Sequence, residues 1–153
     1  MDIDCLALGV GCRPDAPPTA LIALVEQLRR AHGLDETPIA MLATIDRRRD
    51  AVALRQLARH LGCPVQGLST TALAGVADRV LTRSPTVAAR LGVDSVAEAA
   101  ALVAASVAAP VAAMAEVDYR RARLLGPRLS SPWATAAFAC FCGGPATAVG
   151  PMA

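Results

Sequence analysis

The amino-acid sequence predicts an α/β fold: a three-layer α/β/α sandwich with a mixed, mostly parallel sheet and a late antiparallel hairpin. Two observations carry this prediction. In the first half of the chain, short apolar runs alternate with segments of helical periodicity, which is typical of parallel strands covered by helices on both faces. Near the end, residues 121–129 and 134–141 have the pattern of two strands joined by Ser130-Ser131-Pro132, a hairpin-type connection.

The first strand is expected at residues 3–10, an apolar run that Gly11 closes. The helix that follows begins at Pro17-Pro18-Thr19 and ends at Gly33, a residue that readily adopts the left-handed conformation found after helix C-termini. Its apolar positions have helical spacing and are Leu21, Leu24, Val25 and Leu28.

The same alternation continues through the middle of the chain. Residues 39–45 form a second apolar run and predict a buried strand. A helix is expected at residues 50–61, with Gly62 as its stop, and a short strand at residues 65–68.

Three further helices are expected before Pro110. Ser69-Thr70 offers an N-cap for a helix that runs through Leu81. Residues 84–92 predict a shorter helix, and Ser95 and Glu98 have the spacing of a capping box that opens a long alanine-rich helix.

The uncharged stretch at residues 99–115 must be compared with a membrane span. It consists mostly of alanine and is interrupted by Pro110, whereas a spanning helix needs about 20 strongly apolar residues. We therefore expect a buried helix and no membrane anchor. The pattern leaves strand and helix open for residues 111–119.

Composition favours one cytoplasmic domain that does not bind nucleic acid. The chain has 153 residues, which predicts a single domain over 1–142 and a loose tail over 143–153. Its net charge of +2 is too small to indicate a nucleic-acid partner. The N-terminus is acidic, unlike a signal peptide, and the five cysteines lack the spacing of a disulfide framework.

Every one of the 15 basic residues is arginine. A GC-rich genome explains this bias by itself. The functional alternative is that planar, permanently charged guanidinium groups suit a ligand with several carboxylates, and the two explanations are compatible.

The carboxyl end of the first strand is the first candidate site. Gly9, Gly11, Cys12 and Arg13 lie where open α/β sheets bind ligands. The two glycines resemble the start of a dinucleotide-binding loop, but Pro14 stands where that loop requires a glycine. A generic backbone turn with an added positive charge is therefore the preferred interpretation.

Cys12 has two interpretations. As a nucleophile it needs a base, which His32 or His60 would have to supply, but both lie near predicted helix C-termini. The favoured interpretation is a small packed thiol beside the ligand. Cys140 and Cys142 share one strand face but have no second Cys or His pair nearby, so no metal site or cofactor is predicted.

Thr44 and Asp46 lie at the end of the second strand and are expected to face the same crevice. Asp46 is either the N-cap of a loop, a hydrogen-bond acceptor or a catalytic base. The three arginines at 47–49 suit a solvated turn or attraction of an anionic ligand. Ser95 and Glu98 frame a helix N-terminus whose N–H groups would suit an anion, although a capping box explains both residues.

Four segments together carry a family resemblance. They occur in order and are GVGCR at 9–13, ATID at 43–46, GVDSVAEAAA at 92–101 and ATAAFA at 134–139. This set resembles the cobalamin-biosynthesis family that contains the stand-alone CobE proteins and the C-terminal domain of CbiG, the cobalt-precorrin-5A hydrolase. The resemblance covers most of the chain, from Cys5 to Ala139.

The resemblance implies a role in building the corrin ring. The hydrolase opens a ring lactone of its precorrin and releases acetaldehyde, whereas the stand-alone homologues belong to aerobic-type pathways. Because only the shared domain is present, the stand-alone form is expected. Relatives often carry a lysine before the final strand; here the corresponding segment holds Arg123 and Arg128, and arginine cannot replace a reactive lysine.

Three functions follow from the resemblance. The first is binding of a polycarboxylate tetrapyrrole intermediate through Gly11, Arg13, Thr44, Asp46 and the helix that begins at Ser95. The second is hydrolysis of a precorrin lactone, with Asp46 as the candidate base and Arg13 holding the oxyanion. The third is a partner role beside other corrin-pathway enzymes.

Overall fold

The computed structural model describes residues 5–91, 95–108 and 122–141. Residues 111–119, the tail at 143–153 and Cys142 lie outside these ranges, so the predictions for them stay predictions. The strands are β1 Cys5–Cys12, β2 Met41–Ile45, β3 Val65–Leu68, β4 Ala122–Leu124, β5 Leu129–Ser130 and β6 Ala134–Phe141. The helices are α1 Pro18–His32, α2 Val52–Leu61, α3 Thr70–Ala74, α4 Pro85–Leu91 and α5 Val96–Ala108, with 3-10 turns η1 Asp46–Arg48 and η2 Ala77–Arg79.

The strands form one six-stranded mixed sheet in the order β3-β2-β1-β6-β4, with β5 also paired to β6. β1 is parallel to β2, and β2 is parallel to β3. β6 is antiparallel to β1, β4 and β5, so it alone runs against the other five described strands. The carboxyl end of β1 therefore meets the amino end of β6, where Cys12 pairs with Ala134.

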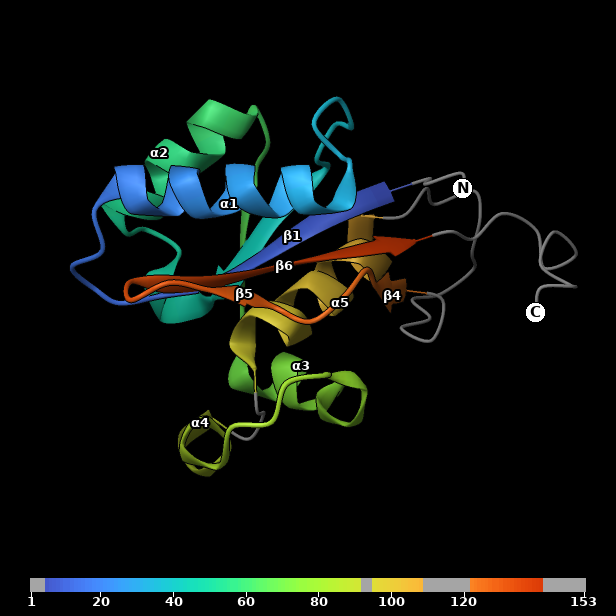
Figure 1. Ribbon diagram of the computed structural model, residues 1–153. Coiled ribbons are helices and arrows are strands. Elements are labelled where there is room, and N and C mark those ends of the chain that lie inside the picture. The colour runs from blue at the N-terminus through green and yellow to red at the C-terminus, as the bar shows by residue number, and fades with distance from the viewer. Residues whose placement is uncertain (1–4, 92–94, 109–121, 142–153) are drawn as a thin grey trace, which may run out of the picture.

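Helices cover both faces of the sheet, which confirms the predicted α/β sandwich. In Figure 1, α1 and α2 lie above the sheet, while α5, α3 and α4 lie below it. Each face has its own apolar core, because successive side chains of a strand point to opposite faces. Leu6, Leu8 and Val10 of β1 pack against α1 and α2, whereas Ala7 faces α5.

The contact between α5 and β1 depends on small residues. Gly9 lies so close to α5 that an added Cβ would overlap the backbone of Ala97 and Ala101. The buried alanines of α5 present almost no side-chain bulk to the strand. The alanine-rich composition of this helix is thus explained by close packing on the sheet.

Most predicted elements are confirmed, and the glycine stops are explained by conformation. Gly33 and Gly62 follow α1 and α2 with φ of 67° and 71°, in the left-handed region. Ser69 caps α3 by accepting the N–H of Ala72 at 3.1 Å. The helix predicted to run through Leu81, however, ends at Ala74; Gly75 follows it, and the chain continues as the 3-10 turn η2.

The predicted hairpin is present, but its first strand is divided. β4 and β5 both pair with β6 and are separated by the segment 125–128, which contains Gly126-Pro127. Proline has no N–H to donate, so it interrupts a strand ladder at this position. Leu125 still donates its N–H to the carbonyl of Phe138 at 3.0 Å, which keeps the segment beside β6.

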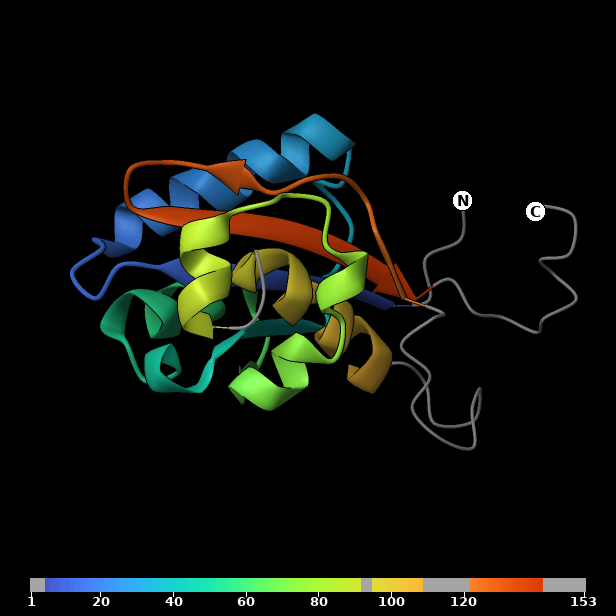
Figure 2. The ribbon, with the colours of Figure 1, turned by 90° about the horizontal axis from the view of Figure 1, so that it is seen from below.

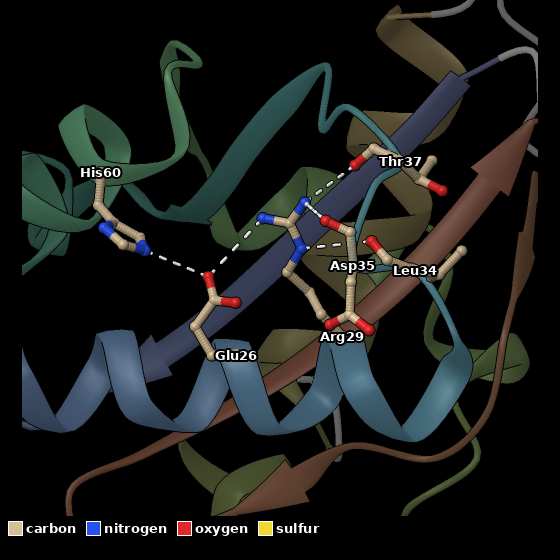
Figure 3. A network of polar contacts seen from close by, with 6 residues as sticks. All are labelled: Glu26, Arg29, Leu34, Asp35, Thr37 and His60. Carbon is tan, nitrogen blue, oxygen red and sulfur yellow. Dashed lines mark hydrogen bonds and ion pairs between the residues drawn. The ribbon is translucent and has the colours of Figure 1, made fainter.

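A polar network on the outer face connects α1, α2 and the loop after α1 (Figure 3). The Arg29 guanidinium donates to three loop carbonyls and lies 3.7 Å from the Glu26 carboxylate. Glu26 is in turn 3.1 Å from His60 Nε2 on α2. The loop carbonyls are those of Leu34, Asp35 and Thr37.

The helices in the described part of the chain are all too short or too polar to cross a lipid bilayer. Part of the uncharged stretch considered above, residues 109–115, lies outside that description.

Candidate functional site

A pocket of about 460 Å³ lies at the carboxyl end of β1, beside the amino end of β6. Residues from both ends of the chain meet there because β1 and β6 are neighbours in the sheet. The lining consists of Gly11, Cys12, Arg13, Pro14, Ile45, Arg47, Arg48, Val87, Val96, Arg128, Ser131, Pro132, Trp133, Ala134 and Thr135.

Gly11, Cys12 and Arg13 are brought together in this pocket, where the sequence predicted a site. The Arg13 N–H donates to the carbonyl of Trp133 at 3.0 Å, which fastens the end of β1 to the turn before β6. Arg13 Nη1 also lies 3.4 Å from the carbonyl of Pro132. These bonds keep the Arg13 side chain at the rim.

Arg47 and Arg48 reach the pocket from η1, directly after β2. Arg48 Nε donates to the carbonyl of Cys12 at 3.1 Å, so it connects the ends of the two parallel strands. The sequence left two interpretations for the arginines at 47–49, a solvated turn or attraction of an anionic ligand. Two of these three arginines line the pocket, which favours the second interpretation.

The charge of the pocket has one sign. Arg13, Arg47, Arg48 and Arg128 all line it, and the described lining residues include no Asp or Glu. None of these four arginines forms an ion pair with another residue in the described ranges. The guanidinium groups are therefore available to an anionic ligand.

The walls between these charges are apolar. Trp133, the single tryptophan of the chain, lines the pocket from the turn before β6. Val87 of α4 and Val96 at the start of α5 contribute aliphatic surface. Apolar walls with a few convergent charged groups are typical of small-molecule sites.

The surroundings of Cys12 favour a protonated thiol. Burial raises the pKa of Cys12 above its ordinary value, and the nearby Arg48 charge opposes this only in part. Neither histidine is among the described lining residues: His60 bonds Glu26, and the His32 ring packs edge-on against Phe138. The packed thiol therefore explains Cys12 better than a Cys–His pair.

Thr44 and Asp46 lie near the pocket without lining it. The Thr44 side chain is fully buried, and its hydroxyl donates to the Val10 carbonyl at 2.8 Å. Asp46 is exposed at the start of η1, and its carboxylate packs against Gly67 of β3. The arrangement gives Thr44 a structural role inside the sheet and keeps the candidate base Asp46 outside the described pocket lining.

The remaining predicted residues are also engaged in the fold. Gly9 packs against the backbone of α5, and Ser95 is fully buried. Ser95 Oγ accepts the N–H of Glu98 at 3.3 Å, which is one half of the predicted capping box. The other half, a bond from the Ser95 N–H to the Glu98 carboxylate, is not formed, because that carboxylate has other partners. The Glu98 carboxylate does not point toward a ligand but accepts hydrogen bonds from Leu81, Thr82 and Arg128.

Trp133 and Arg128 are among the lining residues that were not predicted as ligand contacts. Trp133 carried no motif, and Arg128 was singled out only as a replacement for a lysine of the relatives. Their positions depend on the antiparallel pairing of β6 with β1 and β5, which local patterns do not reveal.

Comparison with known proteins identifies the family. The family described as cobalamin synthesis G C-terminus matches residues 6–139. Protein CobE of Sinorhizobium sp is 32% identical over 142 residues, which are 93% of this chain and 81% of that protein.

Solved structures agree in fold. The crystal structure of CobE, described as a protein from the cobalamin (vitamin B12) biosynthetic pathway, has a TM-score of 0.76 at 34% identity and covers 92% of each chain. Cobalamin biosynthesis protein chiG from Agrobacterium tumefaciens str. C58 has a TM-score of 0.62 at 31% identity, covering 90% of this chain and 98% of that chain.

A putative cobalamin biosynthesis protein G homolog from Sulfolobus solfataricus shares the fold, with a TM-score of 0.61 at 15% identity. The match covers 92% of this chain and 38% of that chain. The chain belongs to the cobalamin synthesis G C-terminus family and is a cobalamin-biosynthesis protein of the CobE/CbiG type.

Proposed function

We propose that this protein binds a polycarboxylate precorrin or corrin intermediate in the pocket at the carboxyl end of β1. Such a ligand combines a broad apolar ring with acetate and propionate carboxylates around its edge. The observation that carries the proposal is the set of four arginines around apolar walls, with no acidic residue among the described lining. A guanidinium group binds a carboxylate through two parallel hydrogen bonds, which suits this chemistry.

The volume of the pocket limits how much of the ligand can enter it. A cavity of about 460 Å³ is smaller than a fully substituted macrocycle. We therefore expect one edge of the ring to enter beside Trp133, with its carboxylates on Arg13 and Arg48. The rest of the ring remains outside, where another pathway enzyme has access to it.

Binding is favoured over hydrolysis of a precorrin lactone. Hydrolysis needs a base or nucleophile in contact with the substrate. Asp46 is not among the described lining residues, and the Cys12 thiol is held protonated by burial. A binding or transfer role requires neither group. We infer a cytoplasmic role, because the five cysteines lack the spacing of a disulfide framework.

The test is a visible-absorbance titration of the purified protein with hydrogenobyrinic acid and earlier precorrins. We expect a saturable spectral shift, and we expect Arg13→Ala to raise the Kd at least about tenfold, since a charged hydrogen bond contributes about 1.5–3 kcal/mol. Arg59→Ala is the matched control, because Arg59 is exposed on α2 and carries the same charge.

Each outcome decides between the candidate functions. An equal loss of affinity in both variants would indicate unspecific attraction to positive charge and would contradict the pocket. A spectrum that changes with time in the wild type and not in Asp46→Ala would favour the hydrolase. Absence of binding to every intermediate would overturn the proposal and favour a partner role.

A further inference from the structure

One buried carboxylate lies behind the pocket. Glu98 is in the first turn of α5 and has no exposed surface. A buried charge is strongly destabilising unless hydrogen bonds replace its lost hydration. The partners of Glu98 therefore show what the carboxylate does in the fold.

Those partners come from two other segments. Glu98 Oε1 accepts the N–H groups of Leu81 at 2.6 Å and Thr82 at 2.9 Å. Oε2 accepts the Thr82 hydroxyl at 2.6 Å and the N–H of Arg128 at 2.8 Å. A single side chain of α5 thus holds the segment before α4 and the segment between β4 and β5.

Both segments supply pocket residues. The first leads into α4, which places Val87 in the wall, and the second contains Arg128. Figure 2 shows α4 and α5 on the same side of the sheet.

Glu98 binds the backbone N–H of Arg128 and does not neutralise the Arg128 guanidinium group. Glu98 accepts the Arg128 N–H, and within the described residues the two side chains form no ion pair. Burial by itself raises the pKa of Glu98, but the hydrogen bonds from Thr82, Arg128 and Leu81 together lower it. The carboxylate is thus held in its charged form, the form that accepts from all its partners.

We propose that Glu98 is a positioning residue that orients Arg128 toward the ligand carboxylates by holding the Arg128 backbone. The role in binding rests on the function proposed above. The hydrogen bond between Glu98 and the Arg128 backbone is independent of that function and can be measured without a ligand.

Glu98→Gln separates the two parts of this arrangement. The Gln side chain has nearly the same shape but only one acceptor oxygen. We expect that oxygen to accept the N–H groups of Leu81 and Thr82, so that the amide NH2 takes the place of Oε2. The Thr82 hydroxyl can rotate and accept a hydrogen bond from this NH2 group. The Arg128 N–H is a donor and cannot accept one, so its hydrogen bond is lost. Glu98→Gln therefore releases Arg128 with little change in volume.

The first measurement is amide hydrogen exchange by NMR on the full chain. In the wild type we expect the Arg128 amide to be protected, and in Glu98→Gln its protection to fall at least tenfold. Ser95→Ala is the matched control, because it removes the cap of the same helix without touching Arg128. An Arg128 amide that exchanges equally in wild type and Glu98→Gln would overturn the proposal, as would an equal loss in Ser95→Ala.

The second measurement is a double-mutant cycle in the hydrogenobyrinic acid titration. We expect Glu98→Gln and Arg128→Ala each to weaken binding about tenfold, with the double variant no weaker than Arg128→Ala alone. Multiplicative losses would contradict the coupling. If the wild type binds no intermediate, the proposed function fails, while the exchange measurement still decides whether Glu98 fixes Arg128.

Discussion

At the scale of single residues, the pocket is defined by arginines that have no ion-pair partner in the described part of the chain. Arg13 and Arg48 are oriented by backbone carbonyls, those of Pro132 and Cys12. Neutral carbonyl partners fix the direction of a guanidinium group without cancelling its charge. This arrangement prepares the side chains for a carboxylate and lowers the entropy lost when it binds.

The Cys12 thiol allows one prediction at this scale. Because burial raises the pKa of Cys12 above that of an ordinary thiol, with the Arg48 charge opposing, Cys12 should react with iodoacetamide more slowly at pH 8 than an unperturbed thiol and faster as the pH is raised. Arg48→Gln removes the opposing charge and should move the rate profile to still higher pH. The measurement is alkylation rate against pH, followed by peptide mass spectrometry, with Arg47→Gln as control. A fast reaction at neutral pH would contradict the packed-thiol interpretation.

Glu98 gives a second prediction, for stability against pH. Its folded pKa is lowered, so its charged form stabilises the fold above the unfolded pKa, and this contribution is lost as pH falls through the folded pKa. Glu98→Gln should lower the free energy of unfolding at pH 7 by about 1–3 kcal/mol, since a buried donor loses its acceptor. In urea unfolding, the difference from wild type should shrink below pH 4. A difference that is constant with pH would contradict the charged hydrogen bonds.

At the scale of elements, the packing of α5 on β1 is the most demanding contact. Gly9→Ala would push a methyl group into the backbone of Ala97 and Ala101, neither of which can turn aside. We expect a loss of about 1–3 kcal/mol in the free energy of unfolding, as overpacking of cores typically costs. Urea unfolding measures it.

Gly11→Ala on the same strand is the control for that substitution. Its added methyl would meet the Thr135 hydroxyl at 3.0 Å, a side-chain atom that can shift. We expect a smaller loss of stability than for Gly9→Ala. Equal losses would indicate that loss of glycine in the strand, and not contact with α5, determines the effect.

Local patterns predicted most elements because each depends on nearby residues. Apolar runs located β1 and β2, and Gly33 and Gly62 located the ends of α1 and α2. The helix expected through Leu81 was too long: α3 ends at Ala74, Gly75 has a low helix propensity, and Ala77–Arg79 form a 3-10 turn. The periodic apolar pattern cannot distinguish these two conformations.

The site was only partly predictable for a related reason. Gly11 and Arg13 were found because a strand end is visible in sequence. Arg128 and Trp133 reach the pocket through the pairing of β6, a nonlocal contact. Thr44 looked available because its hydroxyl is polar, but the Val10 carbonyl accepts it within the sheet.

At the scale of the whole molecule, the charge distribution matters more than its sum. The net charge is only +2, yet four arginines converge on one pocket at the junction of β1 and β6. A concave site with one sign of charge focuses the field and attracts ligands of opposite sign. The sheet order creates this junction, because it places the chain's first and last described strands side by side.

The most direct test of the carboxylate-binding pocket uses the single tryptophan as its probe, since Trp133 lines the pocket. The measurement is Trp133 fluorescence during titration with hydrogenobyrinic acid and, in parallel, with its fully methyl-esterified form. We predict saturable quenching by the acid and binding at least tenfold weaker for the ester, because the arginines lose their anionic partners. Equal binding of acid and ester, or no saturable quenching by either, would contradict the account.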